Sequence, residues 1–154
     1  MATRSTIAME FADGTVEQIY CHWDGYLSNN GRILQEHYKD PFKVQQLIDG
    51  GAVSSLRPEI GVKHAFSSFE STPKISSEDY DRLYGDMTTF YARDRGEHIV
   101  SHYFKSFADY KRKAQSEEYN YILRRDGHWY VEFYGEFDGL LEEAFEFQAA
   151  KEAA

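Results

Sequence analysis

The sequence predicts an α+β domain in which a mainly antiparallel sheet, built from N- and C-terminal hairpins, is packed with several helices on one face. Strand-forming residues flank an Asp-Gly turn near each end of the chain, and helical periodicity fills most of the region between them. The regular alternation of strands and crossover helices that a doubly wound parallel sheet needs is missing. At 154 residues, one such domain can bury a core without a metal or a disulfide.

Each end of the chain carries the pattern of a β-hairpin. Residues 5–11 alternate in polarity, and a second strand-like run follows the Asp13–Gly14 turn. Residues 118–124 and 128–133 alternate in the same way on either side of Asp126–Gly127. The sequence therefore predicts two tight hairpins, far apart along the chain.

Helices are expected between the hairpins and after the second one. They are predicted at 27–38 with Ser28 or Asn29 as N-cap, at 41–49 with Asp40 as N-cap, at 77–84 with Ser76 as N-cap, at 104–113, and after Asp138 as the cap of the last helix. Short strands are predicted at 87–91 and 99–103, around a turn at 94–96. Residues 52–73 are rich in Ser, Gly and Pro and are predicted to form a mobile loop.

Composition limits the classes of function. The formal net charge is −9, which disfavours direct contact with nucleic-acid phosphates. Cys21 is the only cysteine, so no internal disulfide can form and a reducing, cytoplasmic setting is expected. The N-terminus lacks a signal-peptide pattern and no apolar run is long enough for a membrane span, so we expect no membrane association.

The acidic charge is concentrated in residues 132–152, which hold seven acids and one base. We expect residues 1–154 to form a single α+β domain and 132–152 to be its acidic, helical C-terminal segment. Such a face often serves only to keep a protein in solution. It also resembles the charge of nucleic-acid phosphates and could fill the basic groove of a partner. The candidate partner-binding residues are Glu136, Asp138, Glu142, Glu143 and Glu146.

The segment 20–26, YCHWDGY, is the densest polar and aromatic cluster. Strand alternation predicts His22 and Asp24 on one face, where they could serve as a base and its orienting carboxylate, with Trp23 or Tyr26 stacking on a ligand ring. The simpler interpretation is a turn at Asp24, a core tryptophan and an ordinary strand histidine. Cys21 is predicted to be a buried apolar residue and not a nucleophile.

A second constellation lies at residues 91–97. Arg93 and Arg95, together with Arg4, could bind phosphate or carboxylate, and the alternative is that they pair with neighbouring acids. His98 and His102 lack the internal glutamate of the HExxH motif, which excludes a zinc protease of that type. No metal site or other cofactor is expected.

The motifs TRSTIA at 3–8, YCHWDGYLSNNG at 20–31, RDRGE at 93–97 and the later EEYNY and WYV runs together resemble a family of small uncharacterised phage and bacterial proteins. These proteins begin TRSxIA and carry a YCHWDGY segment. The resemblance spans most of the chain and implies no particular activity. It implies a phage-type setting, in which small acidic proteins bind and inhibit a host factor or a defence system.

Two functional hypotheses follow. In the first, the chain is a non-enzymatic, phage-type accessory protein that binds and inhibits a host or defence protein with a basic surface, as a monomer or homodimer, through the acidic C-terminal segment and exposed aromatic residues. In the second, it is a nucleotide-like small-molecule binding protein or a hydrolase that uses the Arg, His and Asp residues above. The second requires those residues to converge in one pocket.

Overall fold

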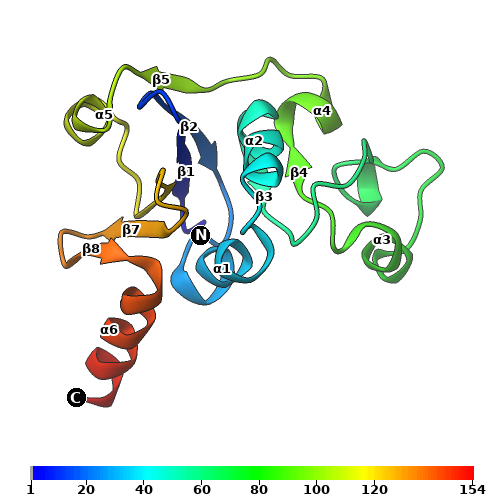
Figure 1. The fold of residues 1–154 in the computed structure, drawn as a ribbon. Helices are drawn as coiled ribbons and strands as arrows, with labels where there is room; N and C mark the ends of the chain where they lie inside the picture. The colour runs from blue at the N-terminus through cyan, green and yellow to red at the C-terminus, as the bar shows by residue number, and fades with distance from the viewer. Residues whose placement is uncertain (1) are drawn as a thin grey trace.

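A computed structural model describes residues 2–154 and places eight strands in one sheet (Figure 1). The strands are β1 Ser5–Glu10, β2 Val16–Cys21, β3 Val53–Ser55, β4 Thr89–Phe90, β5 His102–Phe104, β6 Tyr119–Leu123, β7 Trp129–Phe133 and β8 Phe137–Leu140. Their order is β4-β3-β2-β1-β6-β7-β8, and β5 pairs with the first half of β2. The pairs β1/β6 and β2/β3 are parallel and the others antiparallel, which confirms the predicted fold class.

Both predicted hairpins are present, and their turns have the expected chemistry. Gly14 (φ 89°) and Gly127 (φ 84°) occupy left-handed positions that favour glycine. The Asp13 carboxylate accepts from the Thr15 amide, and the Asp126 carboxylate accepts from the His128 amide. Parallel pairing of β1 with β6 places the two hairpins side by side in the middle of the sheet. A second turn, through a non-glycine residue with positive φ (Tyr134), adds β8 to the C-terminal hairpin.

The helical elements are η1 Leu27–Gly31, a π-helical turn, followed by α1 Arg32–His37, α2 Pro41–Asp49, the 3₁₀ turn η2 Ser68–Glu70, α3 Ser77–Tyr84, α4 Tyr91–Arg95, α5 Phe107–Lys113 and α6 Leu141–Ala153. The predicted N-caps of α2 and α3 are confirmed, because the Asp40 and Ser76 side chains accept hydrogen bonds from the Phe42 and Asp79 amides. Within residues 2–154, none of these helices has the length and apolarity that a membrane span requires.

Three predicted helix starts are wrong. The helix at 27 follows Tyr26 without a side-chain cap, so neither Ser28 nor Asn29 serves as N-cap. The helix expected from 104 begins at Phe107, after an N-cap at Ser106. Asp138 lies in β8, opposite Glu132, and the last helix begins only at Leu141. Residues 132–140 are therefore largely strand and turn, because pairing with β7 overrides the local helical signal.

The predicted strands in the middle of the chain are only partly correct. β4 contains just Thr89 and Phe90, and the segment from Tyr91 forms α4, which ends at the left-handed Gly96 (φ 77°). The Asp94 carboxylate accepts from the Phe90 amide and from His64 N–H, so contacts distant in sequence stabilise this helical turn. The predicted strand at 99–103 is displaced to His102–Phe104, and the predicted loop 52–73 contains β3 and η2.

The two faces of the sheet are covered very differently. Helices α1, α2 and α6 pack on one face and build the main core, whose fully buried members include Ile7, Leu34, Ile48, Tyr121, Val131 and Leu141. The other face carries a smaller apolar cluster, in which Tyr110 of α5 packs on Ala8, Val16 and Ile122. Figure 1 shows α5 on the side of β1 and β2 away from α1 and α2. This second face is therefore packed by a single short helix, whereas three helices pack on the first.

Candidate functional site

Strand register gathers polar side chains on the face that carries α5. Thr6 lies opposite Asn120, Asn120 opposite Glu132, and Glu132 opposite Asp138, so one row of the sheet crosses four strands. Because side chains alternate along a strand, Gln18 of β2 points to this same face. The result is a polar surface in the centre of the sheet, where an apolar surface would be expected.

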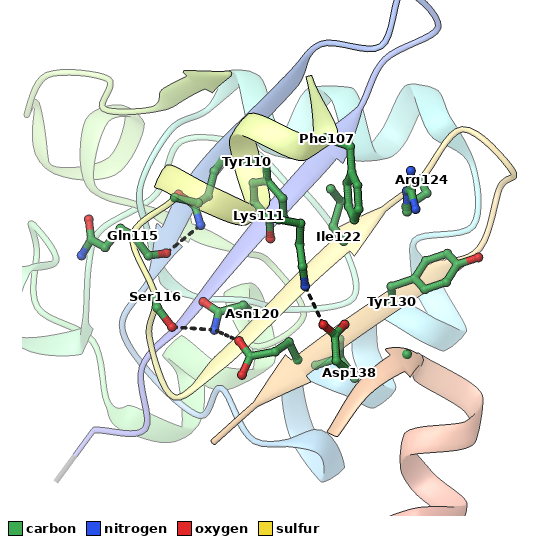
Figure 2. A pocket seen from close by; sticks show the side chains of 15 residues that line it. Phe107, Tyr110, Lys111, Gln115, Ser116, Asn120, Ile122, Arg124, Tyr130 and Asp138 are labelled. Atoms are coloured by element: carbon green, nitrogen blue, oxygen red, sulfur yellow. Dashed lines mark hydrogen bonds and ion pairs between the residues drawn. The ribbon is translucent and has the colours of Figure 1, made fainter. Parts of the chain in front are cut away.

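A cavity of about 400 Å³ lies between α5 and this surface; we call it the α5 cavity (Figure 2). Across its mouth the Lys111 ammonium lies 2.7 Å from the Asp138 carboxylate and joins α5 to β8. Deeper in, the Asn120 amide donates to Ser116 Oγ and to Glu132 Oε1, at 3.3 and 3.0 Å. The cavity thus combines aromatic walls, from Phe107, Tyr110 and Tyr130, with closely packed hydrogen-bonding groups, as in small-molecule sites.

The Asn120 side chain anchors this network. Its Oδ1 accepts from Thr6 Oγ1 at 2.9 Å and from the Glu117 amide at 3.0 Å, while its Nδ2 also donates to the Glu117 carbonyl. The residue is buried, and its bond with Thr6 is shielded from water, whereas those with Glu117 are partly buried. Asn120 therefore fixes both the Glu132 carboxylate and the loop that leads from α5 into β6.

A second, shallower hollow of about 460 Å³ lies on the same face; we call it the Arg4 hollow. Its lining includes Arg4, Tyr20, Tyr91, Glu97, His98 and His102. Burial raises the pKa of Tyr20, and the neighbouring Arg4 charge opposes that rise. Gln115 lines both this hollow and the α5 cavity, so the two are neighbours.

The predicted His22 and Asp24 pair does not form. His22 Nδ1 instead lies 2.7 Å from the Tyr20 hydroxyl. His22 therefore contacts a residue that lines the Arg4 hollow but does not line the hollow itself. Strand β2 ends at Cys21, and Asp24 has a positive φ of 56°, so alternation does not continue to Asp24. Among the described residues no hydrogen bond joins the two side chains, and this removes the orienting carboxylate from the predicted site.

Arg93 and Arg95 line neither hollow, and both already have partners. Arg93 binds the Asp94 carboxylate with two nitrogens and donates to the carbonyls of Ile60 and Thr88, so it stabilises the α4 region. Arg95 lies over the Phe66 ring and pairs with Glu70 and Glu97. The three predicted arginines therefore do not converge, since only Arg4 reaches a hollow.

The two aromatic residues predicted to stack on a ligand are exposed at the surface. Trp23 is 42% exposed and is no core anchor, and Tyr26 is 39% exposed at the start of η1. Cys21 is fully buried, as predicted, and burial raises the pKa of its thiol. Burial therefore disfavours a nucleophilic role for the sulfur, although Asn30 Nδ2 donates a hydrogen bond to it.

The predicted acidic surface is only partly available. Glu136 is paired with Lys151 at 2.8 Å and Asp138 with Lys111, so the charge of both is locally balanced. Glu142, Glu143 and Glu146 lie on α6, are exposed, and have no Lys or Arg partner among residues 2–154. These three residues form what we call the acidic face of α6. Spacings of three and four residues place them on one side of the helix.

The polar row around Asn120 was missed from the sequence. Gln18 and Asn120 each interrupt a strand-like run with an amide, and this was the only signal in the sequence for the polar row.

The chain matches no protein-family model, no curated protein and no solved structure. Within residues 2–154, no group of three or more His, Cys, Asp or Glu side chains is arranged to hold a metal ion.

Proposed function

We propose that this protein is a non-enzymatic docking protein that binds a partner protein with a basic, nucleic-acid-binding surface through the acidic face of α6. The observation that carries the proposal is the exposure of Glu142, Glu143 and Glu146 without counterions, while other acids nearby are paired. Opposite charge speeds encounter and fixes orientation. The resemblance to phage proteins points to a host or defence factor as the partner, which binding would inhibit.

The packing of α6 supports a rigid docking surface. Leu141 and Ala144 are fully buried in the main core, and Phe147 packs edge-on against Phe133 and Phe137. Figure 1 shows α6 extending from β8 to the C-terminus at the periphery of the molecule. The first turn of the helix is thus held firmly while its acids face outward, so little conformational entropy is lost when a partner binds.

Helix α6 packs against η1, and an exposed aromatic residue comes directly before η1. Phe145 of α6 contacts η1, where a side chain at Gly31 would lie 3.5 Å from the Phe145 ring, and Tyr26 comes directly before η1. Exposed tyrosines next to charged groups are typical anchors of protein interfaces. We therefore include Tyr26 with the acidic face of α6 in the proposed contact surface.

The test compares two triple variants in affinity capture from host lysate, at low and moderate salt. Glu142→Lys, Glu143→Lys and Glu146→Lys reverse the acidic face of α6. Glu78→Lys, Asp81→Lys and Asp86→Lys change the net charge equally on and beside α3, where these acids are also exposed. Each captured protein is then purified and its affinity for both variants is measured.

The α6 triple is expected to weaken partner binding by about 10- to 100-fold, since an exposed pair contributes about 0.2–1 kcal/mol and reversal adds repulsion. The α3 triple is expected to bind normally, and double-stranded DNA is expected to compete for the partner. The proposal is wrong if no captured protein distinguishes the two triples, or if binding is insensitive to salt.

One observation favours a second candidate function, the binding of a small nucleotide-like anion in the Arg4 hollow. Arg4 lines this hollow together with Tyr20 and Tyr91. The guanidinium of Arg4 is suited to a phosphate, and the two tyrosine rings are suited to stacking on a base. Arg4→Ala is expected to abolish binding of adenosine monophosphate in calorimetry, while Arg82→Ala on α3, outside the hollow, leaves it unchanged. Equal binding by both variants would contradict this role.

A further inference from the structure

One buried polar atom next to the α5 cavity has no partner. Gln18 is 1% exposed, and its Oε1 is the one buried side-chain oxygen or nitrogen in residues 2–154 that lacks a hydrogen bond. Leaving such an acceptor unpaired costs about 1–3 kcal/mol, so proteins rarely retain one without a reason. Gln18 lines the α5 cavity, which lies outside the acidic face of α6.

The orientation of the Gln18 amide is fixed by its other end. Nε2 donates to the Gln115 carbonyl at 3.0 Å, and rotating the amide by half a turn would bring two oxygens together. The unpaired group is therefore a carbonyl oxygen that needs a donor. This oxygen is almost closed to solvent, and the hollow that the Gln18 side chain lines is the α5 cavity, from which a donor would approach it.

The same cavity contains one carboxylate without a cationic partner. Lys111 pairs with Asp138, and Arg124 pairs with Glu10, so both cations in the lining are occupied. The Glu132 carboxylate accepts only from the amides of Asn120 and Gly135 and has no cationic partner within the described chain. Burial and then the charges of Glu132 and Asp138 raise the pKa of the Tyr110 hydroxyl, as expected in a negative potential.

The remaining walls suit a flat cation. Phe107, Tyr110 and Tyr130 line the cavity, and the Arg124 guanidinium already lies 3.5 Å from the Phe107 ring centroid. A guanidinium stacks on aromatic rings and carries five N–H donors, enough for a carboxylate and a separate carbonyl oxygen. An ammonium offers fewer donors and no flat face.

We propose that the α5 cavity binds a guanidinium group, with the Glu132 carboxylate balancing its charge and Gln18 Oε1 accepting one of its N–H groups. This site is independent of the proposed docking surface, since it uses no residue of α6. The guanidinium belongs either to a small free ligand or to an arginine side chain of a peptide, and these sources share the same chemistry.

The test is a titration of the ¹⁵N-labelled full chain with methylguanidinium chloride, followed by NMR at constant ionic strength. Tetramethylammonium chloride serves as the cation without N–H donors, and an acetylated, amidated Gly-Arg-Gly peptide tests the arginine source. The variants are Glu132→Gln, Gln18→Met and, as a matched carboxylate outside the cavity, Glu118→Gln.

Methylguanidinium is expected to shift the amide signals of Asn120 and Tyr110 and to saturate. Glu132→Gln is expected to weaken binding at least about tenfold and Gln18→Met about fivefold, in keeping with hydrogen bonds to a charged group. Because Gln18→Met also removes the hydrogen bond from Gln18 Nε2 to the Gln115 carbonyl, its melting temperature is measured in parallel, which separates loss of a ligand group from loss of the fold. Glu118→Gln and the α6 triple are expected to bind within about twofold of the unchanged chain.

If the peptide shifts the same signals, the arginine source is supported; if only methylguanidinium does, a small free ligand is supported. The proposal is overturned by shifts of equal size with tetramethylammonium, by absence of shifts at the cavity, or by unchanged binding in both Glu132→Gln and Gln18→Met. Because the α6 triple is measured in parallel, loss of partner docking and loss of the cavity site can be told apart.

Discussion

Tyr121→Phe tests how the 22–26 segment is held on the sheet. The Tyr121 side chain is fully buried, and its hydroxyl donates to the Gly25 carbonyl at 2.6 Å across 96 positions of the sequence. Within residues 2–154 this is the one hydrogen bond that the Gly25 carbonyl accepts. Removing the hydroxyl therefore leaves a buried acceptor without a donor.

The expected loss of stability follows from that unpaired carbonyl. An unsatisfied buried group costs about 1–3 kcal/mol, while the ring itself keeps its packing. In a chain of this size, each kcal/mol corresponds to a change of about 2–4 °C in melting temperature. We thus expect Tyr121→Phe to lower the free energy of unfolding by about 2 kcal/mol and the melting temperature by about 4–8 °C.

The assay is urea unfolding followed by circular dichroism, with Tyr119→Phe as the matched control. Tyr119 lies on the same strand and the same face, but its hydroxyl has no hydrogen-bond partner in the part of the chain described. The control is expected to change the free energy of unfolding by less than about 0.5 kcal/mol, with the slope in urea unchanged in both variants.

The reasoning is refuted if the two variants lose the same stability. Equal losses would mean that the Tyr121 hydroxyl contributes nothing beyond its ring. A large loss in Tyr121→Phe with unchanged Trp23 fluorescence, measured in a Trp129→Phe background, would still support the hydrogen bond, but it would show that segment 22–26 keeps its position without it.

Three further predictions concern stability. Burial raises the pKa of Glu10, but the Arg124 hydrogen bond, the Arg125 amide and both arginine charges outweigh it, so the pKa is lowered from 4.5. Because the pKa of Glu10 is lower in the folded state, the ionised carboxylate stabilises the fold above about pH 4.5, and this stabilisation is lost as the pH falls further. Glu10→Gln is therefore expected to be less stable than the unchanged chain at pH 7 and to approach its stability at pH 3 in thermal melts. Gly50→Ala places a methyl group against the Phe90 ring and is expected to cost about 1–3 kcal/mol by urea unfolding, whereas the same change at the open Gly96 loses only about 1 kcal/mol of backbone preference. Trp129→Phe removes the 2.9 Å bond from the indole N–H to the Tyr38 carbonyl, and an unfolding free energy within about 0.3 kcal/mol of the unchanged chain would contradict its expected cost of about 1–3 kcal/mol.

The sequence predicts one part of the candidate site, the acidic face of α6, but not the α5 cavity. The exposed acids of α6 could be found from composition, because charge and helical spacing are local properties. The α5 cavity could not, since Gln18, Asn120 and Glu132 meet only after β1 pairs with β6. The ion pairs that balance Glu136 and Asp138 were hidden for the same reason, as each partner lies 15 or more positions away.

The sequence alone determined the two hairpins, the caps of α2 and α3, the burial of Cys21 and the acidic character of the C-terminal segment. Each depends on neighbours within a few residues, through turn geometry, capping or side-chain polarity. Tertiary structure decided the rest. Parallel pairing of two distant hairpins set the strand order, and pairing with β7 turned Asp138 from a helix cap into a strand residue. It also covered one face of the sheet with three helices and the other with one, which is why the polar cavity is there.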